Sequence, residues 1–252
     1  QGGEAFYLRD EDSGAFWSPT PWPAPSHEPY LTRHGFGYSV FEHRAHGIGS
    51  TLRTFVPPDA PLKYSVLTLR NDSDAPRRLS VTGHVDWLLD QAGGAGLQVV
   101  TATDLASGAL LARNAFGAGF EDKVAFFHLD AEQLASTCDR AEFVGRHGDL
   151  ARPDGLLRAG LSGSSGAAYD PCATLQCAFT LAPGATRELV FVLGVAGPGS
   201  LDASRMAQQY GRAQAAAAAW DGLRAWWDDT LGAFHIESPD PALDLRLNGW
   251  LP

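Results

Sequence analysis

The stretch Leu79-Ser80-Val81-Thr82-Gly83-His84-Val85-Asp86-Trp87 places apolar residues at odd positions and polar residues at most even positions. A period of two puts alternate side chains on opposite faces of an extended chain. The alternation therefore predicts a β-strand with one buried face. Residues 62–69 predict another strand before it, and the turn-forming residues 71–76 between the two are typical of a hairpin with a longer loop.

Further strands are indicated on both sides of this pair. Ile48, Leu52 and Val56 share one face of a strand that ends before Pro57-Pro58. Residues 174–181 and 187–195 flank Ala182-Pro183-Gly184-Ala185, which predicts a second hairpin, and its nearly continuous apolar second strand indicates cover on both faces. Many antiparallel strands joined by turns rich in proline and glycine predict a large β-sandwich.

The pattern changes after residues 197–200, Gly-Pro-Gly-Ser. Ser200 is a good N-cap, and apolar residues then recur at spacings of three and four. They predict one helix over residues 201–231 with a single apolar stripe: Met206, Tyr210, Ala213, Ala217, Trp220, Leu223, Trp227 and Leu231. A second helix is expected to begin at Asp240 as N-cap, with Pro241 in its first turn.

Composition limits the classes of function. The chain has 252 residues, of which 44% are hydrophobic, enough for one large domain or a domain with an appendage. Its net charge of −10 disfavours nucleic-acid binding, whereas neutral sugars are indifferent to this charge. Three cysteines without a C-x-x-C spacing indicate a reducing compartment, so we expect a cytoplasmic location: Cys138, Cys172 and Cys177.

Membrane attachment is left open by the sequence. The chain has no apolar run of transmembrane length and no signal peptide at its start. Because Gln1 is not a natural start, the chain is expected to be an excised piece of a longer protein. That longer protein could carry membrane segments of its own and be attached to an inner membrane.

Two tryptophans lie in a proline-rich stretch, residues 17–23. Proline fixes φ and pushes the residue before it toward extended conformations, so this loop is expected to be stiff. Trp17 and Trp22 on a stiff loop would suit the apolar C–H face of a sugar ring. The alternative is that both side chains pin the loop onto the sandwich.

The stretch Arg33-His34-Gly35-Phe36-Gly37-Tyr38 leads into a strand. Gly35 and Gly37 allow close approach of the backbone or positive φ. Arg33 and His34 could hydrogen-bond a sugar hydroxyl or a partner surface. The alternative is a structural turn in which Arg33 satisfies backbone carbonyl groups.

Neither a metal site nor a catalytic pair is predicted. Glu42 and His43 point to opposite faces of a strand, so they cannot easily share one ion. Paired carboxylates are the usual machinery of glycosidases. The available pairs lack a context that would raise one pKa and lower the other: Glu11 and Asp12, Asp86 and Asp90, Glu121 and Asp122, and Asp228 and Asp229.

Three distant segments resemble one family. They are Tyr7-Leu8-Arg9-Asp10-Glu11-Asp12-Ser13-Gly14-Ala15-Phe16-Trp17-Ser18-Pro19-Thr20, Arg33-His34-Gly35-Phe36-Gly37-Tyr38-Ser39 and Asp170-Pro171-Cys172-Ala173-Thr174-Leu175-Gln176. Together they are similar to the β-sandwich region of glycoside hydrolase family 94, the cellobiose/chitobiose phosphorylase and cyclic β-1,2-glucan synthetase family. Residues 42–48, 77–81 and 238–244 continue the similarity in the same order.

The resemblance implies a mainly β fold: a large antiparallel β-supersandwich of the galactose-mutarotase type, a long linker helix and the start of an (α/α)6 barrel. The corresponding expected ranges are residues 1–198, 199–235 and 236–252. The first strands of the supersandwich are expected to be missing, because relatives carry sandwich sequence upstream of Gln1.

The resemblance also implies an activity for the longer protein. Family members are inverting phosphorylases, in which an Asp of the barrel protonates the glycosidic oxygen while inorganic phosphate attacks the anomeric carbon. The residues of the Trp-Ser-Pro-Thr and Arg-His-Gly-Phe-Gly-Tyr motifs look closest to the phosphorylase region of cyclic β-1,2-glucan synthetases. Because the catalytic Asp belongs to the barrel, the resemblance assigns no catalytic residue, metal or cofactor to this chain. Inorganic phosphate is the expected co-substrate of the longer protein.

Roles for the chain itself follow by analogy. Trp17, Arg33, His34 and Tyr38 are candidates for shaping the acceptor side of an active site, and Trp22 joins them as a candidate sugar contact. The expected partners are a β-glucan or gluco-oligosaccharide, the catalytic barrel and a second copy of the chain in a homodimer. The alternatives are a free-standing carbohydrate-binding module and a purely structural or dimerisation element.

Overall fold

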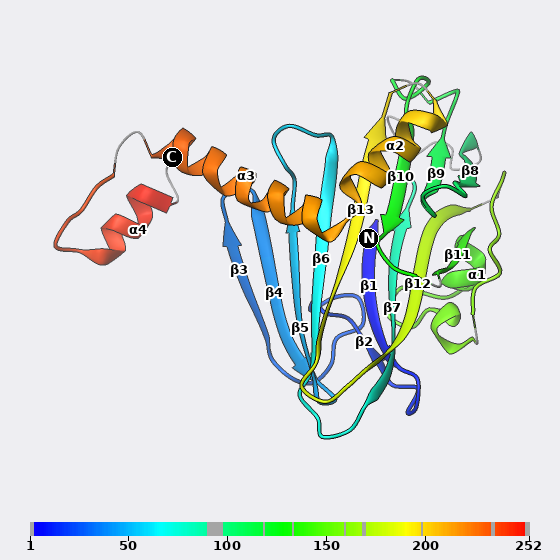
Figure 1. Ribbon diagram of the computed structural model, residues 1–252, viewed down its shortest axis with the longest axis horizontal. Coiled ribbons are helices and arrows are strands. Elements are labelled where there is room, and N and C mark those ends of the chain that lie inside the picture. The colour runs from blue at the N-terminus through cyan, green and yellow to red at the C-terminus, as the bar shows by residue number, and fades with distance from the viewer. Residues whose placement is uncertain are drawn as a thin grey trace.

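The computed structural model describes residues 3–89, 98–117, 119–132, 134–158, 160–167, 170–197, 199–232 and 235–249. Within these residues two antiparallel sheets lie face to face as a β-sandwich (Figure 1). The five-stranded sheet, in spatial order, consists of β11 (Leu134–Asp139), β12 (Pro171–Leu181), β7 (Arg77–Asp86), β1 (Glu4–Asp10) and β2 (Phe16–Trp17). The mainly β fold predicted from the alternation is thus confirmed.

The second sheet is larger and carries the features that matter for function. It has eight strands in the order β3 (Tyr30–Gly35), β4 (Tyr38–Ala45), β5 (Ile48–Phe55), β6 (Leu62–Asn71), β13 (Thr186–Ala196), β10 (Val124–Leu129), β9 (Leu110–Arg113) and β8 (Val100–Thr103). Figure 1 shows β3 to β6 fanning out from the body of the sandwich.

The main core fills the space between the two sheets. Leu8 and Val81 from the five-stranded sheet meet Leu67 and Phe191 from the eight-stranded sheet, and each is at most 1% exposed. Phe191 also meets Phe6 edge to face, with ring centroids 5.0 Å apart. Fully burying one such side chain stabilises a fold by about 1.5–3 kcal/mol, so this shared layer holds the sheets together.

The outer face of β7 is buried as well, so the prediction of a single buried face was wrong. Thr82 and His84 point away from the core, yet they are 1% and 0% exposed. The segment with α1 (Arg140–Phe143) and the 3-10 helix η2 (Asp154–Leu157) covers this face, and Phe143 stacks on His84 at 4.9 Å. Thr82 and His84 are therefore buried and hydrogen-bonded, to Gln176 and Thr174 respectively, rather than hydrated.

Both predicted hairpins are instead connections between the two sheets. β6 pairs with β13 in one sheet, and β7 pairs with β12 in the other. Asn71 joins the two connections: its N–H donates to Ala185 O, its carbonyl accepts from Gly184 N, and its amide nitrogen donates to Leu181 O. Local alternation is the same whichever sheet the next strand joins, so it predicted the strands but not their partners.

Two helices cover part of the outer face of the eight-stranded sheet. α2 (Ser200–Tyr210) and α3 (Ala213–Leu231) replace the single helix that was predicted, and α3 runs across the sheet past β3 (Figure 1). The helical conformation is interrupted at Arg212, whose backbone is extended with ψ 148°. At Gly211, the residue before it, a Cβ would lie 2.3 Å from the ring of His128 in β10. Because glycine has no Cβ, the connection between α2 and α3 can pack directly against β10.

The predicted apolar stripe divides between these helices. Tyr210 and Trp220 are half-buried and Leu223 is buried against the sheet, as predicted, whereas Ala213 and Ala217 face solvent. The expected cover of β13 on both faces is confirmed, because the five-stranded sheet lies on one side and the helices on the other. Ser200 is the first helical residue and Gly199 holds the N-cap position, which corrects the predicted cap.

The last described helix is α4 (Pro241–Gly249). Asp240 caps it as predicted, because its Oδ1 accepts a 2.9 Å hydrogen bond from Ala242 N. Asn248 ties the helix to the preceding segment through two hydrogen bonds with the backbone of Ile236. Within the described part of the chain, no helix combines the length and apolar character that crossing a membrane requires.

Candidate functional site

The β3–β4 hairpin meets α3 at its turn, Phe36-Gly37. Gly35 pairs with Tyr38, and the Tyr38 ring lies over Gly35 so closely that a Cβ there would be 2.2 Å from the ring. Gly37 has φ +75°, and a Cβ there would lie 2.4 Å from Trp227 Nε1. The close approach and positive φ predicted for these glycines are therefore both present, and Gly37 serves the contact with α3.

Aromatic rings fill this contact, which we call the hairpin junction. Trp220 meets Tyr38 and Phe55 edge to face, with ring centroids 4.8 and 5.3 Å apart. Trp227 stacks on Phe36 at 5.6 Å. Each such pair contributes about 0.5–1.5 kcal/mol beyond burial of apolar area, so the junction fixes α3 on the sheet.

Arg53 lies beneath α3 beside the junction. Its guanidinium carbon is 4.3 Å from the centroid of the Trp220 ring, and its Nε is buried without a hydrogen-bond partner. Burial lowers the pKa of Arg53, while Glu188 and Asp221 act in the opposite direction. The cation is therefore held on the face of an aromatic ring, at the edge of the area that α3 covers.

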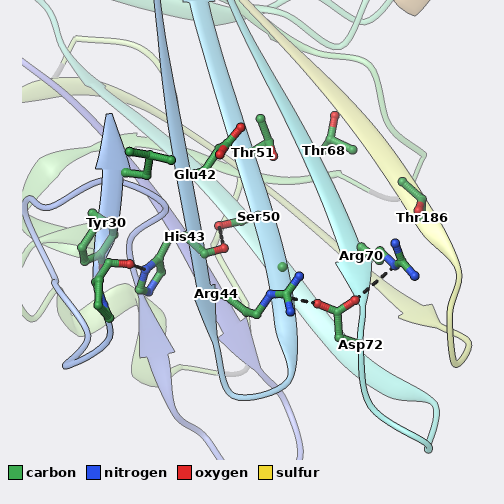
Figure 2. A pocket seen from close by; sticks show the side chains of 13 residues that line it. Tyr30, Glu42, His43, Arg44, Ser50, Thr51, Thr68, Arg70, Asp72 and Thr186 are labelled. Carbon is green, nitrogen blue, oxygen red and sulfur yellow. Dashed lines mark hydrogen bonds and ion pairs between the residues drawn. The ribbon is translucent and has the colours of Figure 1, made fainter. Parts of the chain in front are cut away.

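Beyond Arg53 the same face of the sheet is open and polar. Strand register aligns Glu42, Thr51, Thr68 and Glu188 in one row across β4, β5, β6 and β13. The next row holds Arg44, Gly49, Arg70 and Thr186. All of these residues except Glu188, together with Leu31 and Asp72, line most of a groove of about 670 Å³, the polar groove, whose side chains Figure 2 shows.

Ion pairs fix the long side chains of the polar groove. The Asp72 carboxylate forms ion pairs with Arg44, whose Nε lies 3.3 Å away, and with Arg70, whose Nε lies 3.1 Å away, and Figure 2 shows the two arginines reaching it from opposite sides. Arg33 Nη1 lies 2.5 Å from Glu42 Oε1. All three guanidinium groups remain more than half exposed, so they keep donors free for a ligand.

The structure separates the residues predicted to contact sugar. Trp17 is 1% exposed in the core, so it pins its loop and offers no surface to a ligand, whereas Trp22 is 45% exposed. Cross-strand pairing places Arg33 and Tyr38 on the face that carries α3 and the polar groove. His34 lies on the opposite face, where its Nδ1 is 2.8 Å from Ser39 Oγ.

The histidine considered for a metal has structural partners instead. His43 stacks on Tyr30 with ring centroids 3.7 Å apart, and its ring nitrogens lie 2.7 Å from Ser26 Oγ and 3.0 Å from Pro29 O. Among the residues that the structure describes, no group of three or more His, Cys, Asp or Glu side chains is arranged to hold a metal ion.

Carboxyl groups with a shifted pKa are held as anions. Burial alone would raise the pKa of Asp86, but hydrogen bonds and charge from His84 and Arg140 lower it. Burial likewise opposes the shift at Asp10, whose pKa falls to about 2 because Arg77 and two backbone N–H groups donate to it. Carboxyl groups with a lowered pKa are ionised near neutral pH, so they have no proton to donate as a general acid.

The polar groove was missed by the sequence analysis. One signal existed: in β5, Gly49, Thr51 and Arg53 alternate with the buried Ile48, Ser50 and Leu52. The alternation shows which residues share a face of one strand. It does not show which residues of β4, β6 and β13 stand beside them, because that depends on register.

The comparisons with known proteins agree on one family. The sequence model described as "Glycosyl hydrolase 94, supersandwich domain" matches residues 1–213. Cyclic beta-(1,2)-glucan synthase NdvB of Rhizobium meliloti (strain 1021) is 33% identical over 255 residues, which cover 99% of this chain and 9% of the relative. N,N'-diacetylchitobiose phosphorylase of Vibrio furnissii is 28% identical over 257 residues, covering 98% of this chain and 32% of the relative.

A solved structure shares the fold. A bacterial glucoamylase complexed with acarbose matches with a TM-score of 0.60 at 9% identity, covering 91% of this chain and 31% of that one. At this identity the likeness concerns the arrangement of strands and helices alone. The chain thus spans about a third or less of the length of these similar proteins.

Proposed function

This chain belongs to the glycosyl hydrolase 94 supersandwich-domain family, and from that premise we propose that it is the non-catalytic sandwich and linker part of an inverting glycoside phosphorylase. The proposed substrates are β-linked gluco-oligosaccharides, in a protein similar to the cyclic β-1,2-glucan synthases. Support comes from relatives described as a glucan synthase and as phosphorylases. Inorganic phosphate would be the co-substrate of the longer protein.

The observation that carries this proposal is the hairpin junction. Trp220 and Trp227 fix α3 against the β3–β4 hairpin, so the helix has a set direction relative to the sandwich. A helix held in this way can position a following domain. We assign residues 1–198 to the supersandwich, 199–235 to the linker and 236–252 to the start of a catalytic (α/α)6 barrel.

In this proposal the catalytic acid lies in the barrel of the longer protein and not in this chain. Inverting phosphorolysis needs one carboxylic acid that protonates the leaving oxygen, and an acid working near neutral pH needs a raised pKa. Asp10, Asp86 and Glu142 have lowered values in this chain, because hydrogen-bond donors stabilise their anions against burial. Their roles are structural, which supports a catalytic acid elsewhere in the longer protein.

A direct assay tests the proposal. The chain is incubated with inorganic phosphate and a β-1,2- or β-1,4-gluco-oligosaccharide, and glucose 1-phosphate is measured. We expect none from this chain alone and release from the longer protein that contains it. Release by the chain alone would overturn the assignment of catalysis to another domain.

A second candidate function is a free-standing carbohydrate-binding module. It is favoured by Trp22, whose side chain is 45% exposed in the loop between β2 and β3. Titration of tryptophan fluorescence with glucans separates the two functions. Saturable quenching that is lost in Trp22→Ala supports a module, and a flat response supports a scaffold.

Self-association is proposed through the uncovered side of α3. Trp226 is 44% exposed and, with the 57–58 proline pair, lines two grooves along the helix, and the exposed Val56 lines one of them. Sedimentation at increasing concentration measures the association. A monomer at high concentration would argue against a role of this surface in a homodimer of the chain.

A reducing, cytoplasmic location remains part of the proposal. Its support is that Cys138, Cys172 and Cys177 are all free and buried thiols. Small buried thiols behave as hydrophobic core residues and need no oxidising compartment.

A further inference from the structure

Part of the outer face of the eight-stranded sheet has polar residues where α3 does not cover it. The change occurs within single strands. In β5, Phe55 is 2% exposed at the hairpin junction, whereas Thr51 and Gly49 on the same face line the polar groove. In β6, Val66 belongs to the cluster with α3, whereas Thr68 and Arg70 are in the groove. The surface beyond α3 is therefore suited to water or to a polar ligand.

The groove offers donors and acceptors side by side. Each guanidinium group has five N–H donors, and Arg44 and Arg70 are positioned through their Nε by Asp72. Glu42 supplies acceptor oxygens, and the hydroxyl group of Thr51 or Thr68 both donates and accepts. A sugar hydroxyl group also donates and accepts at once, so adjacent hydroxyl groups of a sugar ring match this lining.

The charges of the residues that line the groove balance. The cations are Arg44 and Arg70, and the anions are Glu42 and Asp72. The chain as a whole carries a net charge of −10, which repels polyanions. A ligand without charge is therefore favoured over a phosphorylated or uronic acid-rich one.

Few apolar side chains line the groove. They are Pro29 and Leu31 at the β3 edge, and the Tyr30 ring is stacked on His43. Interfaces between proteins depend on buried aromatic and arginine anchors in closely packed pockets. An open groove with threonine and glycine at its floor does not offer such pockets, so a protein partner fits it less well than a polyhydroxylated chain.

The dimensions favour several sugar rings. The lining runs from β3 through β4, β5 and β6 to β13, and strands about 4.8 Å apart make this about 19 Å. A volume of about 670 Å³ lies within the range of small-molecule sites. We propose that the polar groove binds a neutral oligosaccharide laid across these strands, namely a segment of the glucan substrate. This inference rests on the proposed function for its choice of glucan.

Calorimetric titration of the chain with a linear β-1,2-gluco-oligosaccharide tests the proposal. We expect saturable binding at one site, weakened at least about tenfold in the double variant Arg44→Ala/Arg70→Ala, because hydrogen bonds to charged groups contribute most to such contacts. Thr68→Trp, which fills the floor of the groove, is expected to weaken binding as well. Arg78→Ala is the matched control, since Arg78 is an exposed, ion-paired arginine of the other sheet.

The outcomes separate this proposal from the proposed function. Absence of saturable binding, or binding that the double variant leaves unchanged, overturns the groove as the site. Tighter binding of a uronic acid-containing oligosaccharide overturns the choice of a neutral ligand. In both cases the scaffold function stands if the chain alone releases no glucose 1-phosphate and the longer protein does. Circular dichroism confirms that each variant is folded, as expected for substitutions of residues outside the buried core.

Discussion

Tyr38 lies edge to face against Trp220, with ring centroids 4.8 Å apart, and this contact joins the β3–β4 hairpin to α3. The hairpin carries the Arg-His-Gly-Phe-Gly-Tyr stretch that the sequence indicated as a candidate for sugar binding. In the structure its glycines and aromatic rings hold a helix. The stretch therefore fixes the position of α3 on the sheet.

Removing the Trp220 ring should loosen α3. Trp220→Ala is expected to lower the local stability of α3 by about 2 kcal/mol, because the ring is half-buried and contacts Tyr38, Phe55 and Arg53. Hydrogen exchange should show faster exchange in α3 and little change in the sheets. Trp226→Ala is the control, since that ring is 44% exposed, and equal effects of the two substitutions would contradict the assigned role.

Two glycines with similar backbone angles should respond differently to alanine. Gly184 has φ +70° with nothing within 4 Å of a Cβ, so Gly184→Ala should cost about 1 kcal/mol of unfolding free energy for the left-handed backbone alone. Gly37 has φ +75° and Trp227 in the path of a Cβ, so Gly37→Ala should cost about 3 kcal/mol.

Urea unfolding of both variants measures this difference. Combining Gly37→Ala with Trp227→Ala should remove the steric part of the cost, so the two substitutions should not be additive. Additive effects, or equal costs for the two glycines, would mean that the close approach of Trp227 is unimportant for stability.

The fold was predictable from the sequence where local periodicity carries the information. Alternation indicated β7, apolar runs beside turns indicated β6, β12 and β13, and the spacing of Trp220, Leu223 and Trp227 indicated a helix. Partners of strands were not predictable in this way. Asn71 holds two connections between sheets through bonds to residues far along the chain, and no local pattern distinguishes such a connection from a hairpin.

The candidate site was predictable only in part. Arg33 and His34 are neighbours in sequence, but alternation in a strand sends them to opposite faces, and only Arg33 borders the polar groove. Trp17 follows the same aromatic pattern as Trp22 yet is buried, because it pairs with Leu8 in the sheet. Exposure of an aromatic residue depends on tertiary packing, which sequence composition does not contain.

The three thiols should be unreactive in the folded chain. Burial raises the pKa of Cys138 and Cys172, and it raises the pKa of Cys177 to about 11, so little thiolate is present near pH 8. A thiol-specific chromogenic reagent should therefore label none of them quickly, and all three after unfolding in urea. Ser165→Cys, at an exposed position, is the control for reagent access. Rapid labelling of a native cysteine would contradict the buried placement.

The Asp10–Arg77 pair should make the chain sensitive to acid. Arg77 donates to Asp10 through two nitrogens, one of them Nε at 3.1 Å, and the folded-state pKa of Asp10 is about 2 against an ordinary 3.8. Because the pKa is lowered on folding, the stabilisation of about 2 kcal/mol is present above about pH 4 and is lost as pH falls through about 2.

Arg77→Ala should remove much of this dependence and should cost about 3 kcal/mol of unfolding free energy at neutral pH, since a carboxylate that is 3% exposed loses its partner. Urea unfolding between about pH 5 and about pH 2 measures both effects. Arg78→Ala is the control, because its pair with Asp12 is more than half exposed and should contribute at most about 1 kcal/mol. A variant at Arg77 with an unchanged slope of stability against pH would show that the backbone N–H donors of Asp12 and Ser13 account for the lowered pKa of Asp10.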